Sequence, residues 1–305
     1  MSGNAEIDGE VLGERRHLLS LAFRMLGTIA EAEDAVQETY ARWYRMSPAE
    51  RDAIESPVGW LTRVASRVCL DVLGSARARR ERYVGPWLPE PVPPGTFTES
   101  LGTASAVVDP LDRVSLDESV STALLIVLET MTPAERVAFV LHDVFAMPFD
   151  EIAEVVGRSP AACRQLAATA RRRVSDHRRQ QVPRAEHDRV VRAFAAATQR
   201  GDLAGLVAVL DPDAVLRADG GGVVSAARNP VLGAERVARF LLGLGEKFPQ
   251  IEVLPQDTPD GLGFVMWDEG RIVAVVTAAV AGGRIAELRM MRNPEKLTLW
   301  NELPA

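Results

Sequence analysis

A change of hydrophobic period near Pro183 is the feature that most constrains how this 305-residue chain folds. Before it, apolar residues recur mostly at helical spacing. After it, four segments alternate or run apolar between Gly and Asp turns, as strands do: residues 250–255, 262–268, 271–280 and 284–291. The sequence therefore predicts a multidomain chain, helical at first and α+β at the end, with a curved sheet packed on helices.

Helix start signals divide the helical part into two regions. In residues 1–82, Thr28 and Glu31 form a capping-box pattern that predicts a helix start. A third helix is expected from Val58 to about Ala78, after a polar loop at residues 47–57. In residues 111–182, the run TPAE at 132–135 has an N-cap residue, a first-turn proline and an acid, so it also predicts a helix start.

Between these regions, residues 83–110 contain six prolines and keep neither a helix nor a strand period, which indicates a linker. Trp87 and Leu88 are large apolar residues that a plain spacer does not need. We expect them to pack onto a neighbouring domain.

A short helix ending in Gly157, a turn, and a second helix capped by Ser159 form a helix-turn-helix pattern. Residues 163–185 carry seven arginines against the single Asp176, although the net charge of the chain is −7. A smaller basic cluster ends the third helix (Arg77, Arg79, Arg80, Arg82). These basic helix ends predict two DNA contacts, although a GC-rich genome also accounts for the preference for arginine.

Nothing in the sequence predicts a membrane or secreted protein. No run of about 18 apolar residues occurs, and the polar N-terminus lacks the apolar core of a secretory signal. Cys69 and Cys163 are the two cysteines, which excludes a disulfide framework or a cysteine-rich metal site. We expect a cytoplasmic protein.

Several segments resemble a known family. AEDAVQETYARWYR and SPVGWLTRVASRVCLDVL resemble the promoter-melting domain of extracytoplasmic-function (ECF) sigma factors, and residues 120–175 resemble its promoter −35 domain. Residues 186–300 resemble a SnoaL-like domain of the ketosteroid-isomerase (cone) fold, which one branch of that family carries. The resemblance implies two all-α sigma domains (1–82 and 111–182, the second with the helix-turn-helix), a linker (83–110) and a cone-like regulatory domain (186–305).

The resemblance also implies partners: the RNA polymerase core, through the β′ clamp helices and the β flap, and promoter DNA. The core-binding residues would be the polar stripe of the second helix: Asp34, Gln37, Glu38 and Arg42. From charge alone, this stripe could equally be a solvated face.

Promoter DNA would meet two sets of residues. At the −10 element these are Arg63, Ser66 and Arg67, expected on the exposed side of the third helix. At the −35 element they are Ser159, Ala161, Ala162, Arg164, Gln165, Ala168, Arg171 and Arg172. Early residues of a recognition helix reach base edges, as expected for Arg164 and Gln165, whereas late arginines bind phosphate. For Arg178 and Arg179 a solvated helix end is plausible.

Three motifs mark the branch with the extension. They are a linker motif (Trp87, Leu88, Pro89), a DGGG motif (Asp219, Gly220, Gly221, Gly222) and an NPEKL motif (Asn293, Pro294, Glu295, Lys296, Leu297). The resemblance implies that they join the C-terminal domain to the sigma part. Taken alone, the DGGG motif fits an ordinary turn at least equally well, and the NPEKL motif could be a helix cap.

Catalysis is not expected. A cone-fold enzyme needs a buried acid–base pair, and Asp219 has no convincing partner, because His187 is expected outside the sheet and no tyrosine follows Tyr83. We expect no catalytic residue, metal or cofactor, but a pocket for a small-molecule ligand is possible. Two alternatives stay open: a bifunctional DNA-binding cyclase or isomerase, and a helix-turn-helix regulator that does not bind polymerase.

Overall fold

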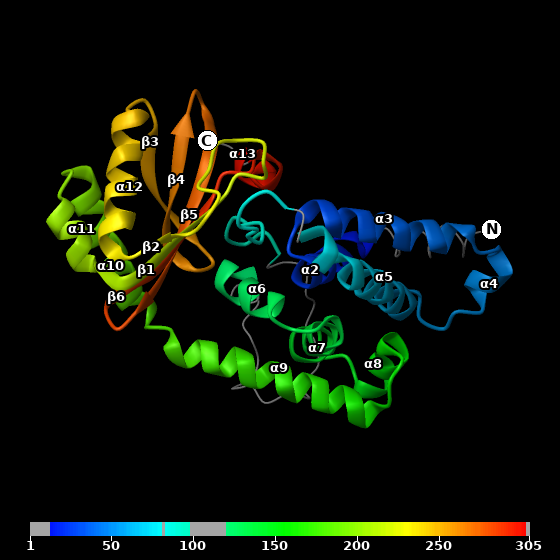
Figure 1. Ribbon diagram of the computed structural model, residues 1–305. Helices are drawn as coiled ribbons and strands as arrows, with labels where there is room; N and C mark the ends of the chain where they lie inside the picture. Colours follow the sequence, from blue (N-terminus) through cyan, green and yellow to red (C-terminus); the bar gives the residue numbers. More distant parts are fainter. Residues whose placement is uncertain (1–12, 81–82, 98–119, 303–305) are drawn as a thin grey trace. The chain divides into compact units, whose positions relative to one another are not determined.

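The computed structural model describes residues 13–80, 83–97 and 120–302 (Figure 1). They form two compact units. The first draws on the ranges 1–79, 95–120 and 127–174, and the second on 80–94, 121–126 and 175–305. The expected domain boundaries stay predictions, but part of the linker and the start of the second sigma-like region belong with the C-terminal sheet.

The first helices of the helical unit are α2 (Arg15–Leu26), α3 (Ile29–Arg45), α4 (Pro48–Asp52) and α5 (Pro57–Arg80). As predicted, Thr28 caps α3, because its side chain accepts a hydrogen bond from the Glu31 amide. The expected polar loop is partly wrong, since it contains α4, which has a complete capping box of Ser47 and Glu50.

The later helical segments are α7 (Pro133–Phe139), the π-helical turn η3 (Val140–Val144), α8 (Phe149–Val156) and α9 (Pro160–Gln180). They follow α6 (Thr122–Glu129), whose first residues belong to the second unit. Thr132 and Glu135 form the predicted capping box of α7. The sequence pattern did not predict η3. Gly157 ends α8 in the left-handed conformation, as the helix-turn-helix pattern requires.

Buried Arg136 joins the two helical regions of this unit. Its Nη1 donates to the Met25 carbonyl at 2.7 Å and pairs with Glu129 at 2.7 Å. Burial lowers the pKa of Arg136 to about 10. A charge that is buried in this way is stable only while it stays paired.

The second unit is a six-stranded sheet with three covering helices, α10 (Arg184–Gln199), α11 (Leu203–Val209) and α12 (Ala234–Lys247) (Figure 1). The strands are β1 (Leu210–Asp219), β2 (Val231–Leu232), β3 (Glu252–Thr258), β4 (Gly261–Asp268), β5 (Arg271–Ala281) and β6 (Arg284–Met291). Their order is β2-β1-β6-β5-β4-β3, in which β1 and β6 are parallel and the other neighbours antiparallel.

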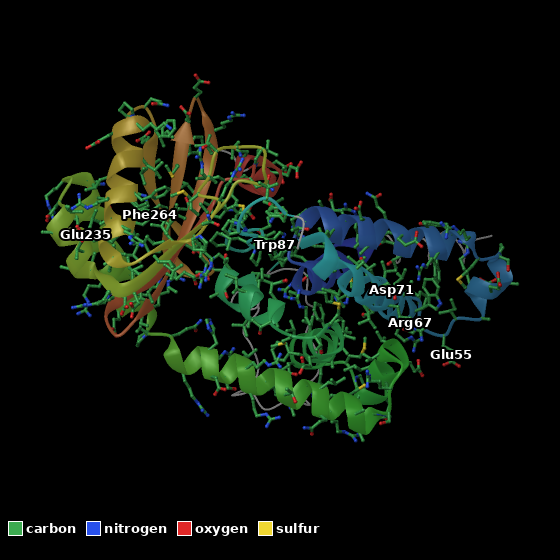
Figure 2. The ribbon with its side chains drawn as sticks, viewed as in Figure 1. Glu55, Arg67, Asp71, Trp87, Glu235 and Phe264 are labelled. Carbon is green, nitrogen blue, oxygen red and sulfur yellow. The ribbon has the colours of Figure 1, made fainter. Side chains whose placement is uncertain are left out.

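The sheet has two apolar faces. One packs on the three helices, where Phe264 of β4, labelled in Figure 2, lies 6.1 Å from Phe194 of α10 between ring centroids. On the other face, Val275 and Met291 pack with Leu88 and with Trp300 of the short helix α13 (Thr298–Glu302). Leu88 therefore packs onto the C-terminal sheet, and its expected role between domains stays a prediction. We call residues 83–94 the strap.

Candidate functional site

Asp219, the last residue of β1, is a fully buried carboxylate that binds the strap. Oδ1 accepts hydrogen bonds from the Tyr83 hydroxyl at 2.7 Å and the Gly221 amide at 3.0 Å. Oδ2 accepts from the Leu88 amide at 2.9 Å and from Lys296 Nζ at 2.9 Å. A carboxylate has about four acceptor positions, so Asp219 is saturated.

Lys296, 6% exposed, is the matching cation. Besides Asp219, its Nζ donates to the Leu88 carbonyl at 2.7 Å. It also lies over two strap rings, 4.4 Å from the centroid of Trp87 and 5.0 Å from that of Tyr83. Cation–π contacts of this kind gain strength when they are desolvated. We call Tyr83, Trp87, Leu88, Asp219, Asn293 and Lys296 the Asp219 cluster.

The NPEKL motif forms a short 3-10 helix, η4 (Pro294–Lys296), that presents Lys296 to the strap. Asn293 caps it by accepting from the Glu295 amide, and its Nδ2 donates to Tyr83 Oη at 3.1 Å. Leu297 is buried in the apolar cluster that includes Leu88. Pro294 and Glu295 are exposed, so the structure does not bring these two predicted residues into the cluster.

Close approach explains all three DGGG glycines. A Cβ at Gly220 would lie 2.5 Å from the Val224 carbonyl oxygen. Gly221 has φ +66°, and a Cβ there would lie 2.5 Å from the Asn293 side chain. Gly222 has φ +74°, and its Cβ would lie 3.1 Å from Val84 of the strap. Both positions therefore favour glycine. The segment after Asp219 is therefore a turn, which is one of its two predicted interpretations, and Gly222 also lies against the strap.

Two residues of this site were missed from sequence. Tyr83 contributes its hydroxyl, and burial together with the hydrogen bond to Asp219 raises the pKa of that phenol. The indole of Trp300 is buried and donates to the Pro91 carbonyl at 2.8 Å. A tyrosine four residues before Trp87 and a tryptophan three residues after NPEKL were signals that could have identified them.

His187 was the other candidate for acid–base chemistry in the C-terminal domain. His187 lies on α10, outside the sheet as expected, but its ring is buried and its Nε2 lies 3.1 Å from the Ala278 carbonyl of β5. In the described ranges, no group of three or more His, Cys, Asp and Glu residues could hold a metal ion.

The polar stripe of α3 is partly self-paired. Asp34 and Gln37 are exposed. Arg42 Nε donates to Glu38 Oε1 at 2.8 Å, one helical turn apart, and this hydrogen bond lowers the pKa of Glu38. Exposed pairs of this kind contribute little stability, so the stripe stays available to a partner.

The predicted −10 residues of α5 differ in exposure. Arg67, labelled in Figure 2, is exposed, and its Nη2 donates to the Glu154 carbonyl of α8 at 2.8 Å. Arg63 Nη1 lies 3.9 Å from the Glu154 carboxylate. The expected exposure of Ser66 is wrong: the residue is fully buried, and its hydroxyl donates to the Thr62 carbonyl, which satisfies it within the helix.

The start of α9 presents the predicted base-reading side chains. Ser159 caps the helix by accepting from the Ala162 amide at 3.2 Å. Arg164 and Gln165 are exposed, and the Arg164 guanidinium lies 5.6 Å from the Phe149 ring centroid. Ala161 is exposed, whereas Ala162 and Ala168 are half-buried.

The later arginines of α9 differ from one another. Arg172 is exposed and near Thr169, as a phosphate-binding side chain would be. Arg171 instead pairs through Nε with the buried carboxylate of Asp143 in η3. Its guanidinium is therefore partly used within the fold.

Two family models match the helical parts of the chain: Sigma-70 region 2 over residues 11–80 and Sigma-70, region 4 over residues 121–174. The ECF RNA polymerase sigma factor SigJ of Mycobacterium tuberculosis is 44% identical over 236 residues, which is 77% of this chain and 72% of the relative. A probable ECF RNA polymerase sigma factor SigI of the same species is 38% identical over 303 residues, 97% of both chains.

The likeness extends to three dimensions. The crystal structure of M. tuberculosis extracytoplasmic function sigma factor SigJ matches with a TM-score of 0.66 and 36% identity, covering 95% of this chain and 98% of that one. The predicted fold class, two all-α sigma domains followed by a cone-like α+β domain, is thereby confirmed. Among the helices in the described part of the chain, none is long and apolar enough to cross a membrane.

Proposed function

The chain belongs to the extracytoplasmic-function (ECF) family of RNA polymerase sigma factors, and we propose that its C-terminal domain restrains this sigma factor in cis by holding the strap. As an alternative sigma factor, it binds RNA polymerase core and promoter DNA and directs transcription initiation; it is not an enzyme. The observation that carries the proposal is the Asp219–Lys296 pair closed over the strap.

A second attachment supports the same proposal. Asp260, in the turn between β3 and β4, accepts hydrogen bonds from the Thr122 amide at 2.9 Å and the Ala123 amide at 2.8 Å. It thereby caps the first turn of α6, where two orphan amides would otherwise need partners. Residues 121–126 begin the segment that matches region 4.

These attachments act on the connection between the two DNA-binding regions. While the strap and the start of α6 are both tied to the sheet, the segments that follow region 2 and begin region 4 are both attached to the C-terminal domain. Release of both attachments would free the strap and the start of α6 from the sheet, and the reach of a chain grows with the number of its free residues. We infer that the docked state is the less active one.

The finer contacts are also proposals. We assign the β′ clamp helices as the partner of Asp34 and Gln37 on α3, and the β flap as a partner of region 4. Arg164 and Gln165 would read bases at the −35 element, and Arg63 and Arg67 would contact the −10 element once they leave Glu154. The protein would act in the cytoplasm, together with the polymerase.

An isomerase-like role for Asp219 is not supported. A general base needs an acceptor position that is open to substrate, and all four positions of this carboxylate are taken by Tyr83, Leu88, Gly221 and Lys296. The carboxylate is better suited to a structural clasp.

Promoter-specific run-off transcription with core polymerase tests the proposal. We compare the full chain with Asp219→Asn, which weakens the clasp, and with Asp257→Asn, the same change at an exposed carboxylate that pairs with Arg184. We expect more transcript from the first variant and no change from the second. Equal or lower output from a variant whose strap is demonstrably released would overturn the inhibitory role.

A further inference from the structure

A small cavity lies between the strap and the sheet. It has room for about one water molecule (about 10 Å³). Its apolar wall comes from both elements, and its polar wall from neighbouring positions of β5 and β6. The principal lining residues are Leu88, Pro91, Val275, Met291, Thr277 and Arg289.

Two buried polar atoms in this wall have no hydrogen-bond partner within the described part of the chain: Thr277 Oγ1 and Arg289 Nη1. Thr277 is 3% and Arg289 4% exposed, and the two residues are direct partners in the β5–β6 register. Buried donors and hydroxyls are nearly always paired in folded proteins. Two such groups that line one cavity therefore point to a guest that supplies the missing partners.

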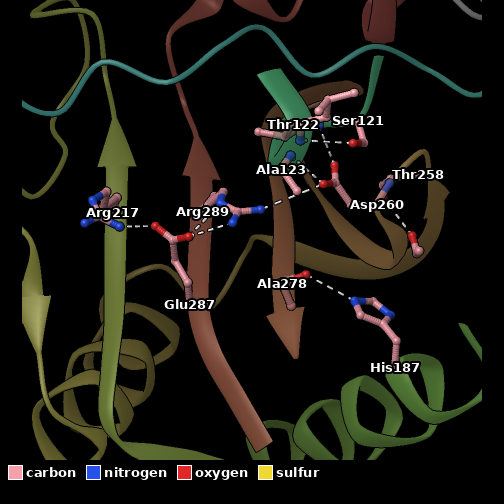
Figure 3. Close-up of polar contacts among 12 residues, drawn as sticks. Ser121, Thr122, Ala123, His187, Arg217, Thr258, Asp260, Ala278, Glu287 and Arg289 are labelled. Carbon is pink, nitrogen blue, oxygen red and sulfur yellow. Dashed lines mark hydrogen bonds and ion pairs between the residues drawn. The ribbon is translucent and has the colours of Figure 1, made fainter. Parts of the chain in front are cut away.

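The charges around Arg289 define the chemistry of that guest (Figure 3). Arg289 Nε and Nη2 both donate to Glu287 Oε2, at 2.9 and 2.6 Å. The other oxygen of Glu287 pairs with Arg217, and Asp260 Oδ1 lies 3.8 Å from Arg289 Nη1. Two guanidinium groups thus face two carboxylates.

Because this cluster is already balanced, a guest anion would leave an uncompensated buried charge, which is unfavourable. A neutral oxygen acceptor satisfies Nη1 without that cost. The Thr277 hydroxyl can then donate to the same oxygen or accept from it. On the sheet side of the cavity, the apolar side chains of Val275 and Met291 suit a hydrocarbon body.

We propose that this cavity is a binding site for a small, neutral, mainly apolar molecule that carries a ketone or hydroxyl oxygen. The strap is its lid, because anything larger than one water must displace Leu88 and Pro91 from the cavity wall. Binding at Arg289 also reaches Asp260, which caps α6. The site rests on the proposed function in one respect: the ligand would release the restraint that the strap imposes.

Isothermal titration of the full chain with four matched probes at millimolar concentration tests the site. The probes are cyclohexanone, cyclohexanol, cyclohexanecarboxylate and methylcyclohexane. We expect the ketone or the alcohol to bind, and the anion and the hydrocarbon to bind at least tenfold more weakly. Equal or better binding of the anion would overturn the charge argument, and no binding of either neutral oxygen probe would mean that the cavity holds water only.

The variant Thr277→Val removes the hydroxyl and keeps the shape of the side chain. It should weaken binding of the neutral probe about tenfold, whereas Thr198→Val on α10, whose hydroxyl bonds to its own helix, should not. Unchanged affinity in the Thr277 variant would show that the probe sits elsewhere.

Hydrogen exchange of the strap, measured with saturating probe, separates this inference from the proposed function. Faster strap exchange with the ketone, absent in Thr277→Val, supports the lid. Binding without faster exchange would overturn the lid. If Asp219→Asn activates transcription while no neutral oxygen probe binds, the restraint stands and the ligand site falls.

Discussion

Replacement of Asp219 by asparagine should release the strap while the sheet stays folded. The amide has nearly the same shape as the carboxylate, so no cavity forms. Its chemistry is wrong, however, because the four groups around it are all donors, from Tyr83, Leu88, Gly221 and Lys296. The side-chain NH₂ of asparagine would face two of these donors, and the buried Lys296 ammonium would lose its counter-charge.

The magnitude follows from these contacts. Two charge-assisted hydrogen bonds lost at about 1.5–3 kcal/mol each give about 3–6 kcal/mol. This agrees with the cost of about 3–5 kcal/mol for removal of one partner of a buried ion pair. Since about 1.4 kcal/mol corresponds to a factor of ten, strap opening should become at least about a hundredfold more frequent.

Hydrogen–deuterium exchange of the full chain measures this opening. Prolines have no amide hydrogen, so the strap peptide reports few positions, and the Leu88 amide among them is bonded to Asp219 itself. The α12 peptide, residues 234–247, serves as the internal reference for global unfolding. Asp257→Asn is the matched control, because an exposed pair contributes at most about 1 kcal/mol.

We expect strap exchange at least about a hundredfold faster in Asp219→Asn, with α12 unchanged. If strap exchange in this variant is no faster than in Asp257→Asn, the buried pair does not hold the strap and the reasoning fails. If α12 accelerates equally, the carboxylate stabilises the whole domain instead of a local clasp.

The remaining predictions concern pH, DNA and polymerase. The pKa of Tyr83 is higher in the folded protein than in the unfolded chain, so its stabilising contribution is complete below the unfolded value of about 10 and is lost as pH rises through the higher folded value. Tyr83→Phe should remove this alkaline dependence of the free energy of unfolding. An unchanged pH profile in the variant would contradict the prediction. Arg164→Ala should cost about 1–3 kcal/mol of binding free energy and relax the base preference at one base pair of the −35 element. Binding assays across promoter variants measure both effects. Arg172→Ala should weaken binding to all promoter sequences alike and lower the salt dependence of binding. The same outcome for both arginines would contradict the division between base and phosphate contacts. Asp34→Ala should weaken core polymerase binding without altering binding of duplex DNA; equal loss of both would mean a folding defect.

The local structure of this chain was largely predictable, because its signals act over a few residues. The capping pairs at Thr28 and Thr132 begin helices where expected. The helix-turn-helix and the C-terminal strands follow from hydrophobic period and turn residues. The errors are also local in origin: a five-residue helix and a π-helical turn are too short to produce a period of their own.

Burial was less predictable where neighbouring elements decide it. Ser66 occupies a helix position that the pattern assigns to the exposed side, but α5 is covered there as well. Arg171 was predicted to bind phosphate, whereas η3 brings the buried Asp143 to it. The period of a helix sequence predicts which face is apolar. Whether the opposite face is also buried depends on elements that are far away in the chain.

The sequence alone predicted a turn at the glycines after Asp219, and the family motifs indicated which segments belong together. The tertiary structure decided the role of the carboxylate, because three of its four donors come from residues 83, 88 and 296, and a single one, Gly221, is local. The charged groups around Arg289 (Arg217, Asp260 and Glu287) could not be grouped from the sequence for the same reason. These charges lie on β1, on β6 and in the β3–β4 turn, and strand register is what places Thr277 beside Arg289.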